Sequence, residues 1–199
     1  MVQILKENIK KRIKEVAIEL FYMNGFAGTK MQEIAEKAHI SVGLSYSYYQ
    51  NKQELFASIV EPIYQQIIGT VEKPKDLVGK QSQEYNLFRR EPAFILQLLK
   101  LQRKPFLILM DQSKGTRFEN ARDQIVKVTR KHIEQQLSPK IDPKAYQMDP
   151  IFYHILANNF VEGLLEIARH YQGHPWAENM LHLLVQQYFY GVQGFHRKS

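Results

Sequence analysis

The sequence predicts an all-α protein with an N-terminal three-helix domain and a larger helical C-terminal domain. Apolar residues recur at three- and four-residue steps along most of the 199 residues. Strand-like alternation, internal repeats and low-complexity segments are absent from the sequence. Capping residues and prolines mark the expected helix starts, and together these signals indicate roughly nine helices.

The composition is that of a globular protein, with 44% apolar and 24% charged residues. No cysteine is present, which excludes disulfides, thiolate zinc sites and a cysteine nucleophile. We find neither a membrane-spanning apolar run nor the apolar core of a signal peptide, and therefore expect a cytoplasmic protein. The net charge of +7 fits a polyanionic partner, but residues 1–60 carry only eight basic against six acidic side chains.

The first expected helix has a single apolar face and ends at Asn24-Gly25, where Gly25 is expected to adopt a left-handed conformation. The apolar face consists of Ile9, Ile13, Val16, Ala17, Leu20 and Phe21, and lysines occupy the other face.

Two short helices follow, separated by the tight turn Ala38-His39-Ile40. We expect the first at Met31–Ala38, opened by a capping box of Thr29 and Gln32. Ser41 is a favourable N-cap for the second, which extends to about Tyr49. Two short helices joined in this way predict a helix-turn-helix, whose second helix enters the DNA major groove.

A fourth helix is expected after Asn51, with Glu54 at the reciprocal capping position. Its apolar spacing keeps helical phase through Pro62, so this proline is expected to kink the helix on its outer face without ending it. The loop Thr70–Lys75 is the best candidate for a domain boundary. We assign residues 1–52 to the helix-turn-helix domain and residues 53–199 to a second helical domain.

The remaining helices are delimited by prolines, by a third capping box (Thr116 and Glu119) and by Asp149-Pro150. The expected segments are Asp76–Arg90, Pro92–Arg103, Phe106–Met110, Arg117–Leu137, a helix from Pro150 to about Tyr171, and Trp176–Val192, with a connector at Gln112–Gly115 and a loop at Ser138–Lys144.

The last two helices are apolar on more than half of their circumference, so each must bury two sides. A two-fold dimer that closes a four-helix bundle satisfies this requirement, and so does a central place in one monomeric core. We favour the dimer. Its predicted interface positions are Phe160, Leu164, Ala168, Met180, Leu184 and Tyr188.

The N-terminal third resembles the TetR (tetracycline repressor) family of transcriptional regulators, most specifically over residues 8–66. The matching residues are Ala17, Leu20-Phe21, Asn24-Gly25-Phe26, Thr29, Ile34-Ala35, Ser41, Gly43, Tyr46, Tyr49, Lys52 and Leu55. The resemblance implies a homodimeric repressor that binds a palindromic double-stranded DNA operator and is released by a small-molecule effector, without a cofactor.

The family's DNA contacts transfer by resemblance to the N-terminus of the first short helix, the exposed face of the second, and the start of the fourth. The positions are Thr29, Lys30, Met31, Ser41, Val42, Gly43, Leu44, Tyr46, Ser47, Tyr48 and Lys52. Two departures stand out: His39 replaces the usual glycine, and Leu44-Ser45 replaces a small polar residue followed by an aliphatic one. Val42 and Leu44 offer only apolar contacts, which suit thymine methyls.

The effector pocket implied by the resemblance would be lined by apolar residues and a few polar ones of the C-terminal domain. The candidates are Phe94, Leu98, Leu101, Phe106, Met110, Phe118, Phe152, Ile155, Asn158, Asn159 and Glu162. Each apolar candidate can equally be an ordinary core residue. A polar stripe of His154, Asn158, Glu162, Glu166 and His170 lacks the Glu-x-x-His spacing of a di-metal bundle, and we predict no metal site.

The sequence shows no phosphate-binding glycine loop, no HExxH and no nucleophile elbow, so we do not expect an enzyme. Two functions remain: a ligand-responsive, dimeric DNA-binding repressor, or an α-helical dimeric interaction module without specific DNA binding. The departures at His39 and Leu44-Ser45 keep the second function open.

Overall fold

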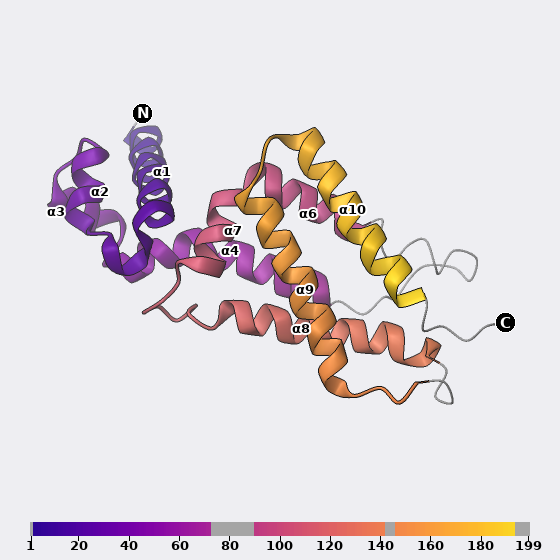
Figure 1. Ribbon diagram of the computed structural model, residues 1–199. Coiled ribbons are helices and arrows are strands. Elements are labelled where there is room, and N and C mark those ends of the chain that lie inside the picture. The colour runs from indigo at the N-terminus through magenta and orange to yellow at the C-terminus, as the bar shows by residue number, and fades with distance from the viewer. Residues whose placement is uncertain (1, 73–89, 142–145, 194–199) are drawn as a thin grey trace. The chain divides into compact units, whose positions relative to one another are not determined.

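The structure is a computed structural model that describes residues 2–72, 90–141 and 146–193 (Figure 1). These residues form nine α-helices and one short 3-10 helix, which confirms the predicted all-α class. The helices are α1 (Val2–Gly28), α2 (Met31–Lys37), α3 (Val42–Tyr48), α4 (Lys52–Glu72), α6 (Arg90–Leu101), α7 (Arg103–Asp111), α8 (Ala121–Leu137), α9 (Pro150–Arg169) and α10 (His174–Gln193), with the 3-10 helix at Ser138–Lys140.

The chain forms two compact units. The first unit contains residues 1–66 and 104–122, and the second contains residues 67–103 and 123–199. The first unit therefore includes more than the predicted domain of residues 1–52, because most of α4 and most of α7 belong to the same compact unit as α1–α3. The functional division at residue 52 remains a prediction.

The first unit is built around an aromatic cluster that joins α1 to α4. The ring of Phe56 makes edge contacts with Phe21 and Phe26, at centroid distances of 5.1 Å and 5.2 Å. All three rings are buried. The apolar run Phe106–Met110 of α7 is also buried, as its composition predicts. This core supports α2 and α3, which lie beside α1 (Figure 1).

Gly25 interrupts α1 as predicted. Its backbone has a φ of 69° and a ψ of 175°, a combination that is essentially restricted to glycine. The amide of Phe26 then donates to the carbonyl of Gln112 at 3.2 Å. The break therefore turns the end of α1 toward the segment that follows α7.

Two of the predicted capping boxes are wrong in detail. The N-cap of α2 is Lys30, which makes no side-chain cap, because the Thr29 hydroxyl donates to the Gly25 carbonyl at 2.8 Å instead. At α4, Asn51 Oδ1 accepts from the Glu54 amide at 2.8 Å as expected, but the Glu54 carboxylate accepts from the amide of Gln50.

Several boundaries also differ from the prediction. Pro62 lies inside α4 as expected, but α4 continues to Glu72 and so includes the first residues of the predicted Thr70–Lys75 loop. Pro92 is the third residue of α6 and not the first. Residues 117–120 form turns, and α8 begins at Ala121. Most of the predicted Asp76–Arg90 helix lies outside the described residues.

In the second unit, α10 packs against α6 and α9. Gly163 lets α9 and α10 approach closely, since a Cβ at this position would lie 2.7 Å from Leu184 Cδ1. Asp149 caps α9 as predicted by accepting from the Ile151 amide at 2.8 Å. Arg103 donates to the carbonyl of Ala168 at 3.1 Å and lies over the ring of Tyr171, so it ties the start of α7 to the end of α9.

Candidate nucleic-acid interface

The second helix of the helix-turn-helix, α3, presents an uncharged and largely exposed face. Ser41 caps it as predicted, with its hydroxyl oxygen accepting from the Leu44 amide at 3.2 Å. Val42, Leu44 and Tyr46 are 38%, 37% and 47% exposed. Gly43 and Ser47 are exposed beside them, and Tyr48 is half-buried. Helix α3 therefore offers methyl groups, hydroxyls and a capped N-terminus to a ligand.

The opposite face of α3 explains one departure from the family pattern. Ser45 is fully buried, and its hydroxyl donates to the Val42 carbonyl at 2.7 Å. Ser45 thus occupies the core position, which leaves Leu44 free to point outward. The Leu44-Ser45 pair is compatible with an intact reading face.

The turn between α2 and α3 is a Schellman motif. The amide of His39 donates to the Glu36 carbonyl at 3.0 Å, and the amide of Ile40 donates to the Ala35 carbonyl at 3.0 Å. His39 itself has a φ of 53°, in the left-handed region that favours glycine. The motif forms even though histidine is unfavourable in this conformation, so the backbone of the turn is strained at His39.

We expect His39→Gly to stabilise the protein by about 1 kcal/mol, because glycine removes the left-handed strain at an exposed site. Urea unfolding followed by far-UV circular dichroism measures the change. His39→Ala serves as the control, since it removes the imidazole but keeps the Cβ. Equal stability of both variants would show that the turn is not strained.

Three predicted contacts at the start of α2 differ in accessibility. Thr29 and Met31 are buried, and the Thr29 hydroxyl is committed to backbone carbonyls. Neither side chain is therefore available to DNA in this conformation. Lys30 is exposed and precedes α2 in an extended conformation, so it is the accessible one of the three.

Lys52 stands at the start of α4, but its ammonium points into the protein. Nζ donates to the carbonyls of Phe26 and Thr29, both at 2.7 Å. It also lies 4.3 Å from the centroid of the Phe26 ring. Burial lowers the pKa of Lys52 below its ordinary value. These partners could not be predicted from the sequence, because two of them are backbone oxygens 26 and 23 residues away.

Further basic groups lie on α1. Lys10 is exposed, and its ammonium lies 5.9 Å from the centroid of the Tyr49 ring. Burial, with the neighbouring Lys10 charge as the second cause, lowers the pKa of Lys14. The Tyr49 ring is buried next to α3, and its burial raises the pKa of the phenol. Helix α1 therefore brings positive charge to the outside of the same unit.

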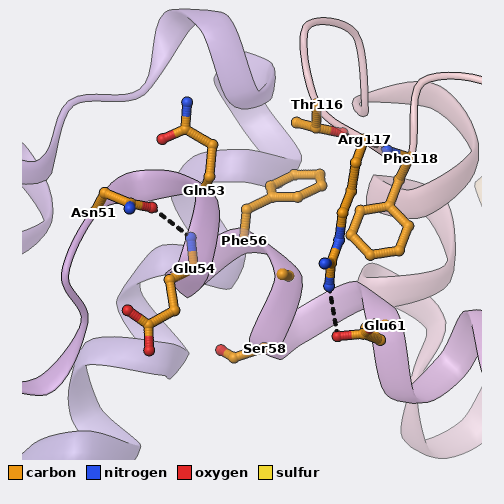
Figure 2. Close-up of a pocket in the computed structure, with 10 residues that line it drawn as sticks. Asn51, Gln53, Glu54, Phe56, Ser58, Glu61, Thr116, Arg117 and Phe118 are labelled. Carbon is orange, nitrogen blue, oxygen red and sulfur yellow. Dashed lines mark hydrogen bonds and ion pairs between the residues drawn. The ribbon is translucent and has the colours of Figure 1, made fainter.

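The first unit also contains an open hollow of about 570 Å³ between α4 and the turn before α8 (Figure 2). The Arg117 guanidinium crosses it to donate to Glu61 at 2.7 Å. Its lining residues are Asn51, Gln53, Glu54, Phe56, Ala57, Ser58, Glu61, Thr116, Arg117 and Phe118. Phe118 belongs to the predicted effector pocket, whereas the other lining residues do not.

The remaining predicted pocket residues are divided between the two units. Phe106 and Met110 are buried in the first unit. In the second unit Leu98 is buried, Phe94, Phe152 and Glu162 are half-buried, and Asn158 and Asn159 are exposed. Leu101 and Ile155 are 64% and 45% exposed, so these two side chains face solvent and do not line a closed cavity in this conformation.

The predicted dimer positions are largely engaged within the chain. Phe160 makes an edge contact with Tyr188 at 5.7 Å, and Leu184 packs on Gly163. Leu164 and Met180 are half-buried. Ala168 is fully buried within the chain itself. Apolar residues that remain exposed on the same two helices are Ile151, Ile155 and Leu183.

The polar stripe of α9 is organised by ion pairs. Arg169 donates to Glu162 at 2.8 Å and to Glu166 at 2.6 Å, and His170 Nε2 lies 3.2 Å from Glu166. The hydrogen bond from Arg169 lowers the pKa of Glu166.

Within the described part of the chain, no cluster of three His, Asp or Glu residues could hold a metal ion. None of the described helices is long and apolar enough to cross a membrane.

Residues 13–59 match the model for bacterial regulatory proteins of the tetR family. The chain is 46% identical over 55 residues to the HTH-type transcriptional repressor SCO4008 of Streptomyces coelicolor, covering 28% of this chain and 29% of that protein. It is 31% identical over 85 residues to the probable HTH-type transcriptional regulator YttP of Bacillus subtilis, covering 43% and 41%. The matched segments thus span less than half the length of these relatives.

Solved structures resemble the chain over nearly its whole length. A TetR-family transcriptional regulator from Bordetella parapertussis has a TM-score of 0.70 at 15% identity, covering 96% of this chain and all (100%) of that one. NalD of Pseudomonas aeruginosa, the secondary repressor of the MexAB-OprM multidrug efflux pump, has a TM-score of 0.58 at 20% identity, covering 91% and 95%. At these identities the likeness shows a common fold. The relatives are named as regulators and not as enzymes, in agreement with the sequence-based expectation.

Proposed function

We propose that this protein represses transcription as an operator-bound homodimer. The premise is that the chain belongs to the tetR family of bacterial regulatory proteins, whose model residues 13–59 match. In this proposal each protomer places α3 in the major groove of one half of a palindromic site. A small molecule bound in the C-terminal domain releases the DNA. A regulator of this kind acts on chromosomal DNA and therefore works in the cytoplasm.

The observation that carries the proposal is the two-sided character of α3. Its buried side, Ser45, packs in the core, while Val42, Leu44 and Tyr46 project outward from a helix with a capped N-terminus. Apolar side chains on the reading face can contact thymine methyls, and helix N-termini and hydroxyls can donate to phosphates. An uncharged reading face suits recognition of A·T base pairs and of DNA shape.

Dimerisation is supported by the exposed apolar side chains of α9 and α10. Ile151, Ile155 and Leu183 remain at the surface after α9 and α10 have packed on each other. Because one recognition helix without charge binds DNA weakly, two copies at a fixed spacing are needed for useful affinity. The effector is proposed to occupy the helical C-terminal domain, where the aromatic and apolar candidates lie.

The test measures binding of the purified protein to the DNA upstream of its own coding sequence and to a random duplex of equal length, by fluorescence anisotropy at stated salt concentrations. The double variant Val42→Ala, Leu44→Ala should lose roughly tenfold or more of its preference for the upstream DNA, because each lost base contact costs about 1–3 kcal/mol. Met23→Ala, an exposed apolar residue of α1, is the matched control.

Two outcomes contradict the proposal. If the wild-type protein binds neither duplex at low salt, the chain is better described as a helical interaction module. If the double variant keeps the full preference, α3 does not read the bases. Analytical ultracentrifugation of the same samples measures the proposed dimer directly.

A further inference from the structure

Lys52 carries its ammonium group at the first position of α4. A cation is unfavourable there, because the N-terminus of a helix already carries partial positive charge. The position therefore requires compensation from elsewhere in the molecule. The structure supplies it through the carbonyl oxygens of Phe26 and Thr29, each 2.7 Å from Nζ.

These two carbonyls belong to the corner between α1 and α2. Gly25 breaks α1, so the backbone at Phe26 and Thr29 no longer follows a regular hydrogen-bonding pattern. The Phe26 carbonyl accepts a turn hydrogen bond from the Thr29 amide at 3.4 Å, and carbonyls outside a regular helix can accept from a further donor. Lys52 provides two hydrogen bonds to a stretch that lies 23 and 26 residues away in the sequence.

The same ammonium connects the corner to the aromatic core. It lies 4.3 Å from the centroid of Phe26, whose ring stacks at 6.1 Å on Phe21. A cation over a ring face is attracted by the ring quadrupole. The lowered pKa of Lys52 agrees with this partly desolvated setting. At most one of its three N–H groups remains for any other ligand.

We propose that Lys52 is a positioning residue that ties the corner between α1 and α2 to the start of α4, and thereby fixes the orientation of α2 and α3 for base reading. The consequence for DNA rests on the proposed function, whereas the consequence for the corner does not. In this view the charge of Lys52 is used inside the protein. In the same proposal, Lys30, which is exposed and follows Thr29, makes the phosphate contact instead.

The experiment compares Lys52→Met, Lys52→Arg and Lys30→Met, at a temperature where circular dichroism shows all variants folded. Binding to the upstream DNA and to a random duplex is measured over a salt series. For Lys52→Met we expect an affinity loss of tenfold or more for the upstream DNA, a change of less than twofold for the random duplex, and an unchanged salt slope. Lys30→Met should instead reduce the salt slope by about 0.9 per protomer.

Lys52→Arg is the decisive variant, because it keeps the charge but cannot place one compact ammonium between two carbonyls. We expect it to be as defective as Lys52→Met. Normal upstream-DNA affinity of the arginine variant, or equal weakening of both duplexes with a reduced salt slope, would make Lys52 a phosphate contact and overturn the proposal. A lower melting temperature with unchanged DNA preference would overturn it too, in favour of a purely structural role.

Amide hydrogen exchange without DNA separates this inference from the proposed function. The Thr29 amide, which donates to the Phe26 carbonyl, should exchange at least tenfold faster in both Lys52 variants. The Tyr49 amide at the end of α3 is the internal reference and should change little. If the wild-type protein binds no DNA, the proposed function fails, but this exchange result still decides whether Lys52 holds the corner. Unchanged exchange at Thr29 would refute the inference.

Discussion

Phe56→Ala should lower the free energy of unfolding by about 3–5 kcal/mol, because it removes a large buried ring and leaves a cavity. Phe56 is 1% exposed and is the common partner of Phe21 and Phe26. Its loss therefore removes both edge contacts, each worth about 0.5–1.5 kcal/mol beyond the buried area. Since these rings join α1 to α4, DNA binding should decline together with stability.

Urea unfolding followed by circular dichroism measures this effect. Phe56→Leu is the matched variant, and it should retain more of the stability because less volume is removed. Met23→Ala, at an exposed site of α1, should change stability by less than about 0.5 kcal/mol. A loss below about 1 kcal/mol for Phe56→Ala would mean that the aromatic cluster does not hold the first unit together.

Gly25→Ala is the second substitution with a large expected effect, a loss of about 2–3 kcal/mol. Two costs combine. The φ of 69° and ψ of 175° are essentially closed to residues with a Cβ, which costs about 1–3 kcal/mol. A Cβ would also lie 2.7 Å from Oε1 of Gln112, so that the Gln112 side chain must move.

A double-mutant cycle with Gln112→Ala separates the two costs. Gln112→Ala removes the side-chain amide and with it the close contact. The stability that Gly25→Ala still loses in this background is the backbone strain. Gly115→Ala tests strain alone, because Gly115 has a φ of 81° with no atom within 4 Å of the added Cβ. Gly69→Ala lies in α4 with open space around it and should be slightly stabilising. A neutral Gly25→Ala would contradict the described break in α1.

The features that the sequence predicted well depend on partners a few residues away. Ser41 and Asp149 cap their helices through amides two or three residues later, and Gly25 breaks α1 through its own backbone. Such interactions follow from residue type and spacing alone. The helical class and the register of α4 through Pro62 were predicted on the same basis, from the apolar period.

The features that were missed depend on a break in the backbone or on partners far away in the sequence. Thr29 has the residue type and spacing of a capping box, but the break at Gly25 brings a free carbonyl to its hydroxyl. Lys52 resembles a surface lysine until the folded corner gives it two carbonyls and a ring. Residue type also could not predict which apolar pocket candidates are buried, since Phe106 is buried and Leu101 is exposed.

The absence of charged residues from α3 has a consequence for how this protein can change over evolutionary time. If the proposed function holds, general attraction to DNA would come from exposed cations on other elements, such as Lys10 of α1 and Lys30 before α2. Under the proposed function, substitutions at Val42 or Leu44 would alter the preferred DNA sequence while leaving the general attraction unchanged. After gene duplication, one copy could acquire a new target sequence through substitutions at Val42 and Leu44, without first losing its general affinity for DNA.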